Sequence, residues 1–470
     1  MLKRSVLTTA LAAVYAAASP LPAFAADDQA LAQMRDEIRQ MKQEYEARIR
    51  ALEARLQAAE TQTAATQAAP APSPATATTT TASTAGGASA FNPEVSLILG
   101  GTYANLSQDP TQFRIQGFVP GGDEIGPGKR GFNLGESELT LRANVDPRFA
   151  GQLTFSLAPD NTASVEEAFF ETKALSSGIN LRGGRFLSSI GYLNNQHAHV
   201  WDFVDAPLAY QAFLGGQFKP DGLQLKWLAP TERFIELGME AGSGAAFPGS
   251  DRNKNGIGST ALFAHVGDDI GESASWRAGL SYLRTGASDR TYEDIDRSGT
   301  GVTNAISGHA NTWIVDGVYK WAPNGNATYT NFKLQGEYFH RKENGTLTYD
   351  TLAQSFGTAA GAYASAQSGW YVQGVYQFRP AWRTGLRYDR LNAGTPDIGL
   401  VSSGSMSAAD FQRLASYKPA RTSIMFDYSP SEFSRFRLQF ARDRSRPEVT
   451  DRQVFLQYIM SLGAHGAHNF

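Results

Sequence analysis

Four residues with metal-binding side chains lie close together near the middle of the chain: His197, His199, Asp202 and Asp205. Imidazole nitrogens and carboxylate oxygens are ligands that suit zinc or a similar divalent ion. His197 and His199 are two positions apart, so both side chains face the same side of an extended segment. The sequence therefore predicts a metal site formed by these four residues. The alternative is that the histidines are hydrogen-bonded within a packed loop.

Weaker metal signals occur elsewhere in the chain. His465 and His468 point to opposite faces of a regular strand and share a metal only if a bulge intervenes. Asp251–Gly256 and Asp294–Gly299 resemble the first half of a calcium loop, but both lack the acidic ligand that ends such a loop. We expect these two segments to be surface turns that bind calcium weakly at most. No cofactor is required, and zinc and calcium are the candidate ions.

Charged residues fall on the polar faces of several predicted strands. The basic set consists of Arg383, Arg387, Arg421, Arg435 and Arg437, with Lys333 and Arg341 on a neighbouring strand. The acidic set consists of Glu136, Glu138, Glu167 and Glu171. If the two sets line a pore on different arcs, the field between them orients dipolar solutes and biases ions. The alternative is that these groups only solvate the lumen.

Several classes of function are excluded by composition and by missing motifs. The chain has no cysteine, which excludes disulfides, cysteine zinc sites, iron–sulfur clusters and thiol catalysis. The formal charge of −3 does not indicate a nucleic-acid-binding chain. No GxSxG, HExxH or glycine-rich phosphate loop occurs. We therefore predict that the protein is not an enzyme, although an outer-membrane enzyme remains an alternative.

The elements that carry these residues are predicted to be strands. Residues 91–470 alternate between apolar and polar side chains, as in Phe332–Tyr338 and Trp370–Phe378. Sixteen candidate strands begin near positions 94, 134, 149, 163, 179, 222, 234, 259, 273, 310, 328, 367, 382, 419, 433 and 452. The predicted fold is all-β: a 16-stranded antiparallel transmembrane β-barrel. A soluble β-sandwich is the alternative.

Short and long connections alternate along this region, which is typical of outer-membrane barrels. The long loops are expected at 108–132, 190–221, 244–258, 286–309, 344–366 and 393–417. Closure of the sheet would remove its unprotected edges. The apolar, aromatic face should contact outer-membrane lipid and lipopolysaccharide. The chain ends in Phe470, and outer-membrane barrels with such an end are recognised by the barrel-assembly machinery.

The N-terminus predicts export and a periplasmic extension. Residues 1–25 have the charged, apolar and small-residue order of a signal peptide, with Ala23-Phe24-Ala25 before the cleavage site. Residues 26–60 carry apolar residues at heptad spacing with one stutter, which predicts a self-associating periplasmic coiled coil, a lone amphipathic helix being the alternative. Residues 61–90 are rich in Thr, Ala and Pro and predict a flexible linker.

The combination of export signal, coil, linker and about 16 strands resembles the phosphate-selective porin O/P family of trimeric outer-membrane channels. Residues 181–191 (LRGGRFLSSIG) look like the strand that leads into the third loop of that family. Residues 191–205 and 462–470 are similar to a branch labelled zinc-regulated outer-membrane proteins. The third loop of general porins folds inward, so the resemblance implies a constriction at 190–221. The residues expected there are His197, His199, Trp201, Asp202 and Asp205.

The predicted function is a homotrimeric porin of the bacterial outer membrane, with the coil in the periplasm. Its water-filled channel would let small hydrophilic solutes or ions diffuse passively, and a link to zinc or other metal uptake is open. Two alternatives are an outer-membrane metal receptor and a structural barrel anchor that the coil ties to peptidoglycan. No nucleic-acid partner is expected.

Overall fold

The computed structural model describes residues 93–463, except 123–124, 136, 159–161 and 174. The predicted signal peptide, coiled coil and linker lie outside the described residues, and so do Glu136, His465, His468 and Phe470. Across the described ranges, no helix is both long enough and apolar enough to cross a membrane.

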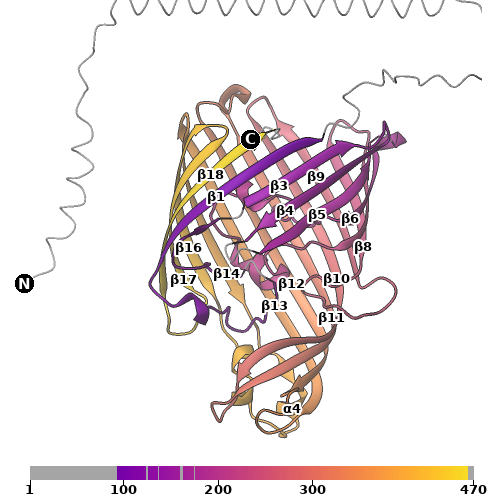
Figure 1. Cartoon of the computed structure of the whole chain (residues 1–470), viewed down its shortest axis with the longest axis vertical. Helices are drawn as coiled ribbons and strands as arrows, with labels where there is room; N and C mark the ends of the chain where they lie inside the picture. The colour runs from indigo at the N-terminus through magenta and orange to yellow at the C-terminus, as the bar shows by residue number, and fades with distance from the viewer. Residues whose placement is uncertain (1–92, 123–124, 136, 159–161, 174, 464–470) are drawn as a thin grey trace, which may run out of the picture. The chain divides into compact units, whose positions relative to one another are not determined.

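The described chain forms one closed sheet in which every strand is antiparallel to its neighbours (Figure 1). Its segments are β1 (Glu94–Leu106), β2 (Gly131–Leu134), β3 (Ser137–Asn144), β4 (Phe149–Leu157), β5 (Ala163–Thr172), β6 (Ile179–Arg185), β7 (Asp221–Leu228), β8 (Phe234–Gly242), β9 (Ser259–Ile270), β10 (Ala274–Ile295), β11 (Gly301–Trp321), β12 (Asn331–Tyr349), β13 (Ala359–Arg379), β14 (Trp382–Asn392), β15 (Asp397–Ile398), β16 (Ala420–Ser431), β17 (Ser434–Arg444) and β18 (Asp451–Gly463). These 18 segments make 16 strands, because β2 and β3 both pair with β1 as one strand and β15 adds only two residues beside β13.

Pairing of the first strand with the last closes the barrel. Ser96 lies opposite Gly463 and Leu106 lies opposite Gln453, without interruption between them. The predicted 16-stranded antiparallel barrel is therefore confirmed. Most strand starts lie close to their predicted positions, since alternation is a local property that needs no knowledge of long-range contacts. The exceptions are β11 and β13, which begin at Gly301 and Ala359 and not near positions 310 and 367.

Side chains alternate between the two faces of the wall. On β18, Leu456 and Leu462 point outward with exposed fractions of 52% and 46%, whereas Gln453 and Phe455 point inward and are buried. Aromatic rings pair on the outer face, as Trp382 does with Tyr428 at 4.6 Å between ring centroids. An apolar outer surface with aromatic rings near strand ends is the surface of a transmembrane barrel.

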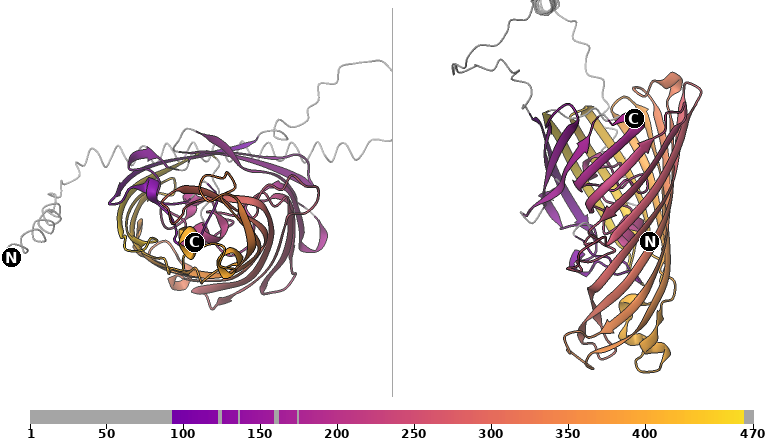
Figure 2. Two further views of the ribbon diagram at one scale, coloured as in Figure 1. Left: turned by 90° about the horizontal axis from the view of Figure 1, so that it is seen from below. Right: turned by 90° about the vertical axis from the view of Figure 1, so that its right-hand side faces the viewer.

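The strands differ greatly in length. Those from β3 to β8 have 7–10 residues, whereas β10 to β13 have 19–22. About 9–11 tilted residues cross a bilayer, so the long strands project well beyond it. Figures 1 and 2 show this projection at the end of the barrel that carries α4 (Gly399–Ser402).

Two segments predicted to be long loops are strands of this projection instead. Residues 286–309 and 344–366 are mostly strand, and the connections are only 296–300 and 350–358. The strands persist because the inward side of the projection has its own apolar cluster, covered by residues from the 393–419 loop. Its buried members are Val302, Ile306, Leu347, Tyr349, Tyr363, Ile398, Leu400, Phe411 and Leu414. Because these segments are polar in composition, the sequence gives no indication of this contact.

The longest connections between strands all lie at one end of the barrel, and very short turns are found at the other end. One end has the short turns 145–148, 229–233, 271–273, 380–381 and 432–433. The opposite end has the long loops 107–130 and 393–419, and also the 186–220 loop. We call residues 186–220 the inward loop, because they enter the lumen.

Candidate functional site

Apolar packing holds the inward loop inside the barrel. Its helix α3 (Leu208–Leu214) is buried at every residue. The helix packs against inward side chains of the neighbouring wall, and the Phe213 ring stacks on Phe339 at 5.6 Å between centroids. The wall residues of this cluster are Ala261, Phe263, Leu283, Ile314, Phe339, Tyr371 and Leu391, which come from β9 to β14. The loop therefore fills the side of the lumen formed by these strands.

A buried carboxylate fixes the loop where it enters the lumen. Glu337 of β12 accepts hydrogen bonds from the Tyr210 hydroxyl at 2.9 Å and the Tyr371 hydroxyl at 2.7 Å. The same carboxylate accepts the backbone N–H groups of Tyr192 and Leu193, each at 3.1 Å. A charged acceptor with several donors makes strong hydrogen bonds. The alternation in the sequence places Glu337 on the polar face, but nothing local shows that it anchors a loop.

The aspartates of the inward loop pair with the basic wall. Asp202 contacts Lys333 Nζ at 2.5 Å and Arg383 Nη1 at 3.3 Å. Asp205 contacts Arg387 Nη2 at 2.8 Å and also pairs with Arg421. The loop thus neutralises part of the positive charge that the strands β12, β14 and β16 present to the lumen.

The predicted position of several arginines in pore water is wrong. Arg387, Arg421 and Arg437 are each about 1% exposed, and Asp205 of the inward loop contacts the first two. Each also pairs with a wall carboxylate, and these partners are Asp389, Asp443 and Asp427 respectively. Buried charges need such partners, since an unpaired charge in a low-dielectric site is strongly destabilising. The alternation predicts the face of each strand but not which residues a loop covers.

Arg341 is also withdrawn from the lumen water. It is 1% exposed, and its guanidinium lies 5.1 Å from the centroid of the Phe213 ring. It donates to the Gln367 side chain at 2.6 Å. Arg341 therefore supports helix α3 and does not line the route of a solute.

The histidines of the inward loop face the opposite, acidic wall. His199 Nδ1 lies 2.8 Å from Glu138 Oε1 on β3, and His197 Nδ1 lies 3.1 Å from Glu138 Oε2. His197 also contacts Glu166 and Glu167 of β5. The predicted metal site of two histidines and two aspartates is therefore wrong. Asp202 and Asp205 lie against the basic wall, because the loop matches each wall with side chains of complementary charge.

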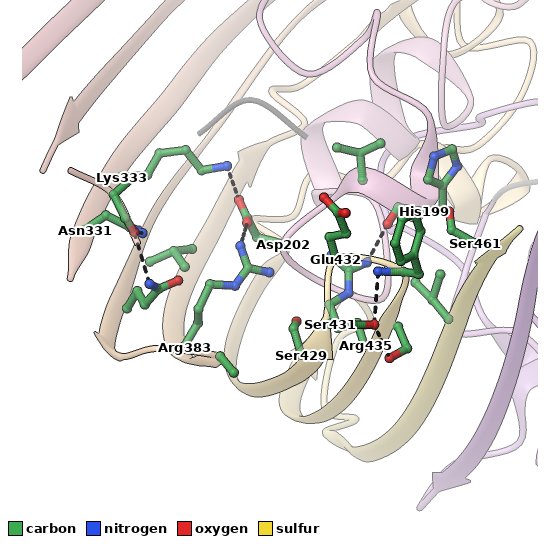
Figure 3. Close-up of a pocket in the computed structure, with 18 of the residues that line it drawn as sticks. His199, Asp202, Asn331, Lys333, Arg383, Ser429, Ser431, Glu432, Arg435 and Ser461 are labelled. Atoms are coloured by element: carbon green, nitrogen blue, oxygen red, sulfur yellow. Dashed lines mark hydrogen bonds and ion pairs between the residues drawn. The ribbon is translucent and has the colours of Figure 1, made fainter. Parts of the chain in front are cut away.

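A cavity of about 380 Å³, lined by both charged and apolar side chains, opens at the short-turn end of the barrel (Figure 3). Its charged lining residues are Lys320, Lys333, Arg383 and Arg435 against Asp202 and Glu432, which leaves a net charge of +2 when His199 is neutral. In Figure 3, Arg435 and His199 lie beside each other, and the Arg435 guanidinium donates to the His199 backbone carbonyl. Lys333, Arg383 and Arg435 are thus the members of the predicted basic set that line open space.

A second cavity of about 220 Å³ continues toward the 107–130 loop. It is lined by Thr102 of β1, Gln457 of β18, and Trp201 and Asp205 of the inward loop, among others. His199 and Ile459 line both cavities. The second cavity therefore lies along the β1–β18 seam, whereas the larger one extends across the ends of β11 to β18, and His199 and Ile459 lie between the two.

The two calcium-loop-like segments are turns. Asp251 accepts the backbone N–H of Asn253 at 2.9 Å. Asp296 accepts hydrogen bonds from Ser298 and from the Tyr349 hydroxyl, which links the two projecting hairpins. Neither segment gathers acidic ligands among the described residues.

No family model matches this chain. An uncharacterized protein of Aquifex aeolicus is 29% identical over 409 residues, which covers 81% of this chain and 80% of that protein. The prediction of a phosphate-selective or zinc-regulated branch therefore stays a prediction.

Solved structures with a similar arrangement are all distant. The trimer form of OmpT from Vibrio cholerae is 12% identical, covers 79% of this chain and 99% of that chain, and has a TM-score of 0.48. The outer-membrane channel DcaP of Acinetobacter baumannii is 13% identical, with coverages of 79% and 97% and a TM-score of 0.46. An anion-selective porin from Comamonas acidovorans is 11% identical, with coverages of 79% and 99% and a TM-score of 0.45. The barrel fold of this chain is established by its own strand pairing.

Proposed function

We propose that the protein is a passive channel of the bacterial outer membrane for small hydrophilic solutes or ions. The observation that supports this function most strongly is the pair of cavities, each with charged residues in its lining, that share His199 and Ile459 within a closed barrel. The apolar outer face suits a bilayer, whereas the inner face is polar. Diffusion through such a channel involves no chemical step, so no catalytic residue is needed.

The charge of the larger cavity favours anions. Four cationic side chains against two carboxylates give a positive potential at the short-turn end. A charged ring at a narrow passage raises the local concentration of counter-ions and lowers that of ions with the same sign. We therefore propose a preference for small anions, with His199 and Arg435 beside the narrowest part of the route.

We also propose that the channel is a homotrimer. The support comes from the family resemblance and from the coiled coil predicted over residues 26–60. The short strands β3 to β8 provide further support, because a wall of 7–10 residues per strand is barely long enough to span a bilayer alone. If this wall lies at the contact between subunits, the neighbouring subunits and not lipid would cover its short strands.

Planar-bilayer recording tests the proposed function. Purified protein, shown to be folded by its heat-modifiable mobility on gels, should produce stepwise, ohmic conductance that rises with KCl concentration. A reversal potential in a KCl gradient should indicate anion preference. Folded protein that produces no conductance steps would contradict the channel and favour a structural anchor. We also propose that the channel is linked to the uptake of zinc or another metal.

A further inference from the structure

We propose that Glu138, His197 and His199 form a binding site for a divalent cation, with zinc as the best chemical match. This proposal deepens the proposed function, on which it rests only for its effect on conductance. In the described part of the chain, these three residues are a cluster of histidine and acidic side chains whose ligand atoms all lie within 4.8 Å of one another.

The separations between the ligand atoms suit a tetrahedral ion. Zinc bonds of about 2.0–2.1 Å place neighbouring tetrahedral ligands about 3.3 Å apart. The Glu138 oxygens lie 3.1 Å from His197 Nδ1 and 2.8 Å from His199 Nδ1. Small side-chain movements therefore suffice to admit an ion. Two imidazoles and one carboxylate with a fourth position left to water form an open type of zinc site.

A neighbouring carboxylate is oriented as the outer partner of a metal-binding histidine. Glu167 Oε2 lies 3.1 Å from His197 Nε2, so a proton on Nε2 leaves Nδ1 available as the ligand. Glu167 is itself fixed by the backbone N–H of Leu187 at 3.0 Å and the Gln152 amide at 2.9 Å. Such carboxylate–histidine pairs set the tautomer and increase the basicity of the ligand.

Glu166 adds another buried carboxylate beside this cluster. It is 2% exposed, its Oε2 lies 3.2 Å from His197 Nδ1, and its Oε1 has no hydrogen-bond partner. This Oε1 pairs with the Lys219 ammonium at 3.7 Å. Three buried carboxylates, Glu138, Glu166 and Glu167, therefore contact His197, which makes the cluster rich in negative charge. A divalent ion beside His197 would compensate it.

A β-bulge brings both glutamates of β5 to the same site. Thr154 pairs with Glu167 and Phe155 pairs with Val165, so Glu166 is the extra residue between them. A regular strand would turn Glu166 away from Glu167, whereas the bulge leaves both buried toward the lumen. Bulges commonly redirect side chains toward functional sites.

The site is accessible from the channel. His199 lines both cavities, so an ion can reach it from the lumen without opening the barrel. Bound there, a divalent ion adds positive charge where the two cavities meet. We therefore expect zinc to change conductance and to strengthen the preference for anions.

Binding is tested directly on the full-length protein in detergent after removal of metal with a chelator. The probes are Co²⁺, whose visible absorption reports tetrahedral coordination, and Zn²⁺, which should displace it. We expect one ion per chain. The double variant His197→Gln with His199→Gln should abolish binding, and Glu167→Gln should weaken it by about 10–100-fold.

A matched control comes from another buried histidine in the barrel. His265 lies 3.0 Å from Glu236 and outside the cluster, so His265→Gln should bind Co²⁺ like the parent. The tail pair His465 and His468 is tested by alanine substitution, which should also leave binding unchanged. Folding of each variant is checked by heat-modifiable mobility, and Glu138→Gln replaces the double variant if the latter does not fold.

Three outcomes would overturn the site: no binding by the parent, unchanged binding by the folded double variant or Glu138→Gln, or loss of binding only in the tail variant. Conductance of the metal-free protein separates this proposal from the proposed function. If the protein conducts but binds no ion, only the proposed metal site is wrong. If it binds an ion but never conducts, only the proposed channel function is wrong.

Discussion

Replacing Arg435 with glutamine should reduce the preference of the channel for anions. Arg435 lines the larger cavity beside His199, where the routes through both cavities meet. The substitution lowers the net charge of that cavity from +2 to +1 and removes little volume. Glutamine keeps an amide that can still donate to the His199 carbonyl, so the loop should stay in place.

The size of the effect follows from Coulomb's law. A unit charge about 8 Å from a passing ion in water contributes about 0.5 kcal/mol. Because anions lose this energy and cations gain it, the anion-to-cation permeability ratio falls by about sixfold without screening. At 0.1 M salt the Debye length is about 10 Å, which reduces the expected change to about twofold.

The assay is the reversal potential in a KCl gradient, recorded at 0.01–0.1 M salt. Two controls separate local charge from total charge. Arg435→Lys keeps the charge and should keep the selectivity, and Arg233→Gln removes a charge from a turn outside the cavities and should also change nothing. A reversal potential that is identical for Arg435→Gln and the parent would refute the assigned route.

Two further perturbations test the contacts that hold the loops. Asp205→Ala removes a carboxylate partner from both Arg387 and Arg421, which keep Asp389 and Asp443, and Arg387 also keeps the backbone carbonyl of residue 205. We expect a loss of about 2–3 kcal/mol of stability, measured as earlier loss of heat-modifiable mobility on warming. Asp205→Asn should lie between this variant and the parent. Burial alone would raise the pKa of Asp296, but hydrogen bonds from neighbouring hydroxyls and N–H groups outweigh it and hold the pKa below its usual range. Its stabilisation of the projecting hairpins is therefore present above about pH 4 and lost as pH falls further, which limited proteolysis at acid pH should detect; proteolysis that is equal for the parent and Asp296→Asn at pH 7 would contradict it.

Local pattern was enough to predict the wall of the barrel, whereas contacts distant in sequence were not predictable. The strand that begins at Trp382 is found where alternation places it. By contrast, His199 and Asp205 lie six positions apart and face opposite walls, because the loop between them crosses the lumen. The inward position of Glu166 was not predicted, for a local reason. Strand faces are assigned from a period of two residues, and the bulge at Glu166 interrupts that period.

The projecting hairpins show the same limit. Residues 286–309 are polar and contain many small side chains, which is typical of loops. Their strands are stabilised by the apolar cluster that includes Leu400 and Phe411 from a loop about 100 residues away in the chain. No short window of sequence contains both sides of this contact.

The central claim, that solutes pass through the two cavities by way of Ile459 and His199, is tested most directly by cysteine modification. The chain has no cysteine, so a single introduced thiol is the only one present. Ile459 lines both cavities, whereas Leu456 on the same strand is 52% exposed on the outer face. A charged methanethiosulfonate reagent should reduce the single-channel conductance of Ile459→Cys and leave that of Leu456→Cys unchanged. If complete modification of Ile459→Cys leaves conductance unaltered, solutes do not pass Ile459 and the proposed route is wrong.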